Sequence, residues 1–163
     1  MVFYRQRSDH WKEGGRMSVL FISDLHLGHE NIIASCGRNA ENCGKNFSSV
    51  EEMNAFLIDK WNRKVTEEDE VYILGDLSYR SSVSVKTYLR QMRGHKHLVV
   101  GNHDFKWMKN VPDMEAYFET VSNLEIIKLD GKLLTLCHYP LLEWNGSGRA
   151  KCQETSLSWL IHG

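Results

Sequence analysis

The sequence predicts an α/β layered domain, and three observations support this prediction. Short apolar runs alternate with segments of helical periodicity early in the chain, a hairpin signal follows later, and a length of 163 residues suits one domain. Hydrophobic residues make up 42% of the chain and charged residues 25%, which is ordinary globular composition and excludes a disordered chain. We therefore expect one folded domain over residues 17–163.

Local patterns predict the elements of the first half of this domain. The apolar run over residues 17–23 predicts a buried strand, and residues 35–47, rich in Gly, Asn and Ser, predict a loop. Ser49 and Glu52 fit a capping box, so a helix with a one-sided apolar stripe is expected to begin there. A second buried strand is expected over residues 71–74.

The second half of the domain gives similar signals. An apolar stripe over residues 85–92 predicts a helix, and Gly94 suits its stop. Residues 98–100 predict a third strand. Asp130-Gly131 lies between two apolar runs, which is a strong signal for a two-residue hairpin turn. A last strand is predicted over residues 157–161.

The first sixteen residues, 1–16, are polar and carry no clear periodicity, and two interpretations of them stay open. The native protein could start at Met17, which would place residues 1–16 upstream of the true start. Alternatively, residues 1–16 form a frayed N-terminal tail.

The net charge and the pattern of apolar residues bear on which partners the protein can bind and on which compartment it occupies. Twenty Lys and Arg residues against 21 Asp and Glu residues give a formal net charge of −1, which offers no basis for holding nucleic acid by bulk charge. The sequence contains no apolar run of about 18 residues and no apolar signal core, so we expect a cytoplasmic protein that does not cross a membrane. In that compartment four cysteines are expected as free thiols: Cys36, Cys43, Cys137 and Cys152.

Side chains of metal-ligand type follow four of the predicted strands, at the point where each strand ends. In open α/β sheets, binding sites form beyond the carboxyl ends of the strands. Each such residue has an ordinary interpretation as a turn former or a surface side chain, but four strand ends of this kind together favour one site. The residues expected at this edge are Asp24, His26, Asp76, Asn102, His103 and His138.

The residue types suit a pair of metal ions that handle phosphate. Asp24 and His26 are two residues apart, so on extended chain their side chains would point the same way. The nitrogen and oxygen donors without thiolate suit Mn²⁺, Zn²⁺, Fe or Ni²⁺, and the carboxylate of Asp76 can bridge two ions that together clamp a phosphate. His103 is a candidate general acid for the leaving oxygen, and Asp104 is expected to orient its imidazole.

The series Asp24-x-His26, Gly75-Asp76, Gly101-Asn102-His103-Asp104 and His138 resembles the calcineurin-like metallophosphoesterase family over residues 17–163. The opening Asp-Leu-His-Leu-Gly-His-Glu-Asn is similar to a small bacterial and phage branch of that family. The resemblance implies a four-layer sandwich of two mixed β-sheets flanked by helices, two divalent metal ions, Mn²⁺ first among them, and hydrolysis of phosphomonoesters or phosphodiesters. It implies one ion on Asp24, His26 and Asp76, a second on Asp76, Asn102 and His138, and His103 as the general acid.

The sequence departs from the family pattern at its end. The last family motif is Gly-His-x-His, and Gly163 would be its glycine, so the two histidines that follow are absent from the printed chain. His162 precedes that glycine and, on strand alternation, is expected to point away from the ions. Each ion then lacks one ligand, and we expect weakened metal binding.

Two rival functions stay open beside a phosphoesterase that acts on a small phosphoester or a nucleotide. One is a nuclease of the same fold, which the near-neutral charge does not favour. The other is a catalytically impaired scaffold that binds a partner. His29 is equally well interpreted as a substrate contact or a surface residue, and Arg38 as a phosphate partner or, more simply, a solvated side chain. Neither the exact substrate nor the oligomeric state follows from the sequence.

Overall fold

The computed structural model describes residues 4–6, 11–12, 15–35, 38 and 45–144. The helices and strands are, in chain order, β1 (Tyr4–Gln6), β2 (Trp11–Lys12), β3 (Gly15–Arg16), β4 (Val19–Ile22), α1 (Asn31–Ser35), α3 (Val50–Asn62), β5 (Glu70–Leu74), α4 (Val85–Leu89), β6 (His95–Val99), α5 (Asp104–Met108), the 3₁₀ helix η1 (Met114–Ala116), β7 (Thr120–Ser122), β8 (Glu125–Leu129) and β9 (Lys132–Leu136).

A five-stranded sheet of order β1-β4-β5-β6-β7 forms the centre of the fold. Strands β4 to β7 are parallel, with Ile22 opposite Ile73 and Leu74 opposite Val99, so that β4, β5 and β6 reach the same edge together. β8 and β9 form a separate antiparallel pair. The predicted α/β class is therefore confirmed as a parallel four-strand sheet, extended by antiparallel β1, with a small antiparallel sheet beside it.

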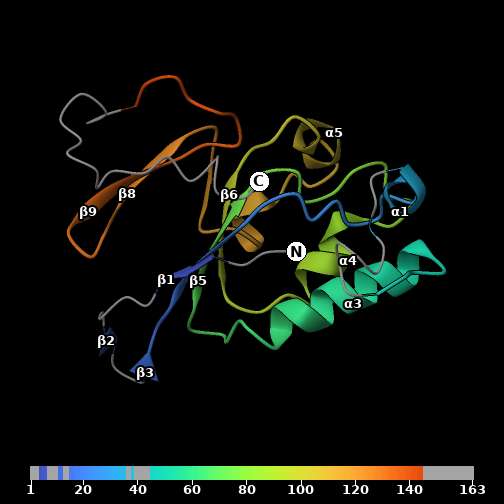
Figure 1. Cartoon of the computed structure of the whole chain (residues 1–163), viewed down its shortest axis with the longest axis horizontal. Helices are drawn as coiled ribbons and strands as arrows, with labels where there is room; N and C mark the ends of the chain where they lie inside the picture. The colour runs from blue at the N-terminus through green and yellow to red at the C-terminus, as the bar shows by residue number, and fades with distance from the viewer. Residues whose placement is uncertain (1–3, 7–10, 13–14, 36–37, 39–44, 145–163) are drawn as a thin grey trace.

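The two faces of the central sheet bury different partners. Figure 1 shows α3 and α4 on one side of the sheet and the β8–β9 hairpin on the other. The helical side holds the larger apolar core, in which Met53, Leu57 and Trp61 of α3 are almost fully buried. The hairpin side holds a smaller core, where Leu134 and Leu136 pack with strand residues of the sheet. Both cores fix the strand ends from which the site is built.

Sequence patterns located most long elements, with differences at their ends. Ser49 caps α3 as predicted, with its side chain accepting a hydrogen bond from the Glu52 amide at 3.2 Å. The hairpin turn is also confirmed, because Asp130 and Gly131 both have positive φ, as a type I′ turn requires. The predicted helix over 85–92 is shorter, since α4 ends at Leu89 and only turns follow it.

Other segments were not anticipated or lie outside the described residues. β1, within the predicted N-terminal tail, pairs antiparallel with β4, whereas the hypothesis of a start at Met17 stays a prediction. The short elements α1, α5 and β7 carried no periodicity in the sequence. The predicted strand 157–161 lies outside the described residues. Cys137 is a buried free thiol. Among the described helices, none is long and apolar enough to cross a membrane.

Candidate metal centre

The loops that follow β4 and β5 run side by side at the carboxyl edge of the sheet. The amide of Asp24 donates to the carbonyl of Gly75 at 3.1 Å, and the amide of His26 donates to the carbonyl of Asp76 at 2.9 Å. Leu27 continues this pairing, because its amide donates to the carbonyl of Leu77 at 2.9 Å. The backbone ladder thus extends past the strands and places three of the predicted site residues in adjacent loops.

The backbone of these residues is not extended, which corrects one step of the sequence argument. Asp24, His26 and Asp76 have φ values of 55°, 48° and 54°, in the left-handed region that side-chain-bearing residues rarely adopt. Strand alternation therefore does not bring Asp24 and His26 together. Two left-handed residues do so, and the His26 Nε2 atom lies 3.6 Å from Asp24 Oδ1. Such conformations cost about 1–3 kcal/mol each and cluster at functional sites.

Two glycines allow the β5 and β6 loops to approach this closely. A Cβ atom on Gly75, whose φ is +85°, would lie 2.4 Å from His138 Nδ1. A Cβ atom on Gly101 would lie 2.4 Å from Asp76 Oδ1 and 3.0 Å from the Cα of Gly75. Any larger side chain at either position would displace a predicted metal ligand. The glycines that the sequence pattern places before Asp76 and Asn102 are therefore required by the space around the site.

Asp76 lies at the centre of the cluster. Its Oδ2 atom is 3.7 Å from His26 Nε2, 3.7 Å from His138 Nε2 and 3.8 Å from His103 Nε2. Its Oδ1 atom accepts a hydrogen bond from the His103 amide at 2.9 Å, which fixes the carboxylate plane. Asp76 is buried, with 3% of its surface exposed. Three imidazole nitrogens from three different loops thus surround one buried carboxylate oxygen.

The contact between His138 and Asn102 tests whether a cation fits here. His138 Nδ1 lies 2.9 Å from the carbonyl oxygen of Leu74 and donates to it, so Nε2 is the ring nitrogen that faces the cluster. This Nε2 lies 3.0 Å from Asn102 Oδ1 and near Asp76 Oδ2. An imidazole nitrogen, an amide oxygen and a carboxylate oxygen that converge in this way are the donor types that divalent cations bind, so this donor set fits a metal ion.

A second group of donors supports the same conclusion. Asp24, Asp76 and His138 each offer a ligand atom, and these atoms all lie within 4.8 Å of one another. On the other side of Asp76, the buried Nδ1 atom of His26 has no hydrogen-bond partner within the described part of the chain. All five predicted metal ligands are therefore brought to one edge, although Asn102 is solvent-exposed. Their roles as ligands stay predictions.

Asp104 does not orient His103, which corrects the role predicted from the sequence. Its fully buried carboxylate accepts four hydrogen bonds, and none comes from the His103 ring. The donors are Asp76 N at 2.8 Å, Leu77 N at 3.0 Å, Gly101 N at 2.8 Å and Trp107 Nε1 at 2.7 Å. Burial raises the pKa of Asp104, and the donated hydrogen bonds oppose this shift because they stabilise the charged form. Asp104 therefore fixes the backbone on which the site residues sit.

The His103 ring is held by aromatic contacts instead. Its centroid lies 4.0 Å from that of Tyr79 and 5.5 Å from that of His26. Tyr79 also meets His29 edge-on at 4.8 Å, and burial, followed by the charges of His26 and His103, lowers the pKa of His29. Sequence reasoning missed Tyr79. Its position three residues after Asp76, in the loop that pairs with the loop after β4, is the signal that could have indicated it.

Two further polar side chains support the loop after β4. The guanidinium of Arg38 donates to the backbone carbonyls of Asp24 and Leu25, so it is not simply a solvated side chain, and its role as a phosphate partner stays a prediction. The buried Asn54 of α3 accepts a hydrogen bond from the Gly28 amide at 2.9 Å. Both residues hold backbone rather than ligand atoms. His162 and Gly163, at the departure from the family pattern, lie outside the described residues.

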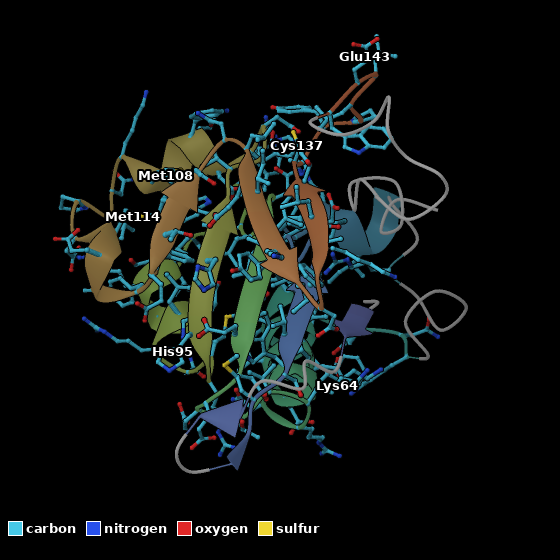
Figure 2. All side chains as sticks on the ribbon, turned by 90° about the vertical axis from the view of Figure 1, so that its left-hand side faces the viewer. Lys64, His95, Met108, Met114, Cys137 and Glu143 are labelled. Carbon is cyan, nitrogen blue, oxygen red and sulfur yellow. The ribbon has the colours of Figure 1, made fainter. Side chains whose placement is uncertain are left out.

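Figure 2 places this edge relative to the rest of the molecule. Cys137, which directly precedes His138, lies at the same end of the sheet as Met108 of α5. Lys64 and His95, which precede β5 and begin β6, lie at the opposite end. The site therefore lies at the carboxyl ends of the parallel strands, where ligands bind in open α/β sheets.

This assembly of carboxylates and imidazoles at one edge agrees with a family comparison. The profile of calcineurin-like phosphoesterases matches residues 17–161. The chain belongs to the calcineurin-like phosphoesterase family. The match covers the predicted domain except its last two residues, and it includes all of the predicted metal ligands.

Relatives of this chain come from archaea, phages and bacteria. An uncharacterized protein of Methanocaldococcus jannaschii is 41% identical over 151 residues, which cover 89% of this chain and 67% of that protein. The gene 66 protein of Mycobacterium phage D29 is 33% identical over 138 residues, covering 76% and 64%. The gene 66 protein of Mycobacterium phage L5 is 36% identical over 87 residues, covering 52% and 38%.

A solved structure gives the same picture of the fold. The crystal structure of a protein of unknown function from Aquifex aeolicus has a TM-score of 0.60 and 30% identity, covering 77% of this chain and 62% of that one. The chain thus spans at most about two thirds of the length of these similar proteins, from 38% to 67%.

Proposed function

We propose that this protein hydrolyses phosphomonoesters or phosphodiesters at the Asp76 cluster with two bound divalent cations. The observation that carries the proposal is the position of Asp76 Oδ2, which lies 3.7–3.8 Å from the Nε2 atoms of His26, His103 and His138. A buried carboxylate with imidazoles around it and further oxygen donors beside it is suited to divalent cations. Membership of the phosphoesterase family supports the reaction class.

The donors divide into two sets that share Asp76. Asp24, His26 and Asp76 would hold one cation, and Asp76, Asn102 and His138 would hold the other. Mn²⁺ is the first choice, and Zn²⁺, Fe and Ni²⁺ match the same mixed nitrogen and oxygen donors. When bound, the cations would supply Lewis acidity toward the phosphoryl oxygens and lower the pKa of a bound water.

His103 would donate a proton to the leaving oxygen. Its side chain is one third exposed, at 33%, so it can meet a substrate, while Tyr79 holds its ring beside the cluster. Its amide donates to Asp76 Oδ1, which ties the acid to the predicted bridging ligand. A positioned imidazole of this kind typically contributes about 10²–10⁴-fold to the rate of proton transfer steps.

The wider setting of this function is also part of the proposal. The β8–β9 pair would belong to the second sheet of the four-layer sandwich of this family. The substrate would be a small phosphoester or a nucleotide in the cytoplasm. Nucleic acid is not favoured, because the formal net charge of −1 provides no general attraction to phosphate backbones.

The test compares Asp76→Asn with a control, Asp59→Asn, which changes an exposed acid in a surface pair with Arg63. Mn²⁺ affinity is measured by calorimetry, and hydrolysis of bis-p-nitrophenyl phosphate is measured with Mn²⁺. The 163-residue chain and a version continued with His-x-His after Gly163 are both assayed. We expect Asp76→Asn to weaken Mn²⁺ binding more than tenfold and to abolish hydrolysis, with the control unchanged.

Two results would contradict the proposal. Absence of hydrolysis by both versions of the chain would remove the phosphoesterase assignment and favour a binding role for the fold. Equal Mn²⁺ affinity in Asp76→Asn and in the unsubstituted protein would remove Asp76 as the shared ligand. Oligonucleotide binding that falls steeply with salt would instead favour a nuclease.

A further inference from the structure

A cavity of about 330 Å³ lies beside the candidate metal centre. The serine-rich segment 78–85 forms one wall and α5 forms the other. Its polar lining residues include Arg80, Ser82, Ser84, His103, Lys106 and Asn110. The volume lies at the lower end of the range for small-molecule sites, about 300–1,000 Å³, so the cavity suits a group the size of a phosphorylated sugar rather than a large ligand.

His103 joins this cavity to the candidate metal centre. Its ring lines the cavity, and its Nε2 atom is 3.8 Å from Asp76 Oδ2. If His103 donates a proton to the leaving oxygen, the group attached to that oxygen extends into the space beyond the ring. This step rests on the proposed function, and it makes the cavity the place where the leaving group binds.

The charge of the cavity selects the kind of leaving group. None of its lining residues is an Asp or a Glu, whereas Arg80 and Lys106 are both present. Within the described part of the chain, neither cation has a carboxylate partner. Each instead lies near the Tyr79 ring, with Arg80 Cζ 5.1 Å and Lys106 Nζ 5.9 Å from its centroid. Exposed cation–π contacts are weak, so both cations can turn to an anion.

The backbone conformation of Arg80 and the neutral hydrogen-bond donors of the cavity also favour an anionic leaving group. Arg80 has a φ of 49°, a left-handed conformation that a non-glycine residue adopts at a cost, and such residues cluster at active sites and ligand clamps. The hydroxyls of Ser82 and Ser84 and the amide of Asn110 line the same space and can donate to phosphate oxygens. Two cations with hydroxyl and amide donors form a set suited to a phosphate group.

We propose that the substrate carries a second phosphate on its leaving group, and that Arg80 and Lys106 bind this second phosphate in the cavity beside His103. The protein would then prefer phosphoesters of phosphorylated alcohols over esters of neutral alcohols. The preference comes from the far end of the substrate, because the reacting phosphate occupies the Asp76 cluster in both cases.

The test compares propane-1,3-diol bisphosphate with propyl phosphate, which differ in the second phosphate alone. Release of inorganic phosphate gives kcat/KM for each, in the unsubstituted protein, in the double variant Arg80→Gln with Lys106→Gln, and in Lys109→Gln. Lys109 ends the same helix without lining the cavity. We expect the bisphosphate to be preferred, the double variant to lower that preference by about 100-fold, and Lys109→Gln to retain it.

A binding measurement separates failure of this inference from failure of the proposed function. Calorimetry with metal-free protein in EDTA measures the affinity for the same two compounds. Tighter binding of the bisphosphate that is lost in the double variant supports the inference even where neither compound is hydrolysed, a result that would overturn the proposed function alone. Equal affinities for the two compounds, or a preference that the double variant retains, would overturn the inference.

Discussion

Replacing Asp104 by Asn tests whether this buried carboxylate holds the backbone of the site. The two carboxylate oxygens share four donors: Oδ2 accepts from the Asp76 and Gly101 amides, and Oδ1 from the Leu77 amide and Trp107 Nε1. Asn offers one oxygen and one NH₂ group. In either orientation, two buried donors therefore lose their acceptor and face another donor.

The magnitude follows from these counts. A buried donor left without a partner costs about 1–3 kcal/mol, so two cost about 2–6 kcal/mol. Burial raises the pKa of Asp104, which means that removing its charge recovers part of this cost. We expect the free energy of unfolding to fall by about 3 kcal/mol in Asp104→Asn. Trp107→Phe removes one donor and part of the indole volume from a buried site, so its unfolding free energy is expected to fall by about 1–3 kcal/mol.

Urea unfolding in EDTA measures these changes without a contribution from bound metal. The surface control Asp59→Asn is expected to lower the unfolding free energy by about 0.5 kcal/mol or less. If Asp104→Asn behaved like this control, the four hydrogen bonds would not hold the loops. A variant with unchanged stability and an altered pH profile of hydrolysis would restore the role predicted from the sequence, orientation of His103.

Three further changes probe other parts of the structure. His103→Ala is expected to slow hydrolysis of an alkyl phosphate at least tenfold more than that of p-nitrophenyl phosphate, because the latter leaving group needs no proton; equal losses in kcat would argue against the acid role. Gly75→Ala places a Cβ atom 2.4 Å from His138 Nδ1 and should lower the free energy of unfolding, measured in urea, by about 3 kcal/mol. Gly131→Ala, whose Cβ would have no atom within 4 Å, should lower it by about 1 kcal/mol. Equal losses of unfolding free energy would refute the close approach of Gly75 to His138. Burial, helped by Glu125 and Glu70, raises the pKa of Tyr72 to about 12. An unfolded tyrosine ionises near pH 10, so this contribution to stability is complete below pH 10 and lost toward pH 12. Between about pH 10 and pH 12, the free energy of unfolding should therefore fall by about 1 kcal/mol less in Tyr72→Phe than in the unsubstituted protein, after allowance for partial exposure of the ring. Equal falls in the two proteins would contradict this prediction.

Periodicity and turn chemistry predicted the parts of the fold whose causes are local. Buried apolar runs located β4, β5 and the last two residues of β6, and Asp130-Gly131 located the hairpin because both residues tolerate positive φ. Short elements escaped prediction, since β7 has three residues and α5 has five, too few to show a period. Parallel pairing then predicted that the ligand-type residues would meet at one edge.

The arrangement within the site was not predictable from residue types, because it depends on contacts between distant residues. Asp104 is adjacent to His103 in the chain, which suggested that the two interact, yet its donors include the Asp76 amide, 28 residues away. Asp24 and His26 belong to residue types that adopt a left-handed backbone more often than most, but the type alone does not say which Asp or His will do so. Parallel strand order was enough to predict that the ligand-type residues lie at one edge. Their exact arrangement depends on hydrogen bonds between the loops, which only the folded chain shows.

The strained backbone at the site depends on the buried carboxylate of Asp104. Asp24, His26 and Asp76 hold conformations that cost about 1–3 kcal/mol each, and such conformations persist only where surrounding structure over-determines them. The pairing between loops and the Asp104 carboxylate supply that constraint through the amides of Asp76 and of its neighbours. Asp76→Asn keeps an oxygen for the His103 amide and leaves this backbone network intact, so it should weaken Mn²⁺ binding more than tenfold at little cost in unfolding free energy. Asp104→Asn changes no proposed ligand and should lower the unfolding free energy first, with Mn²⁺ affinity falling because the loops that carry the ligands are released.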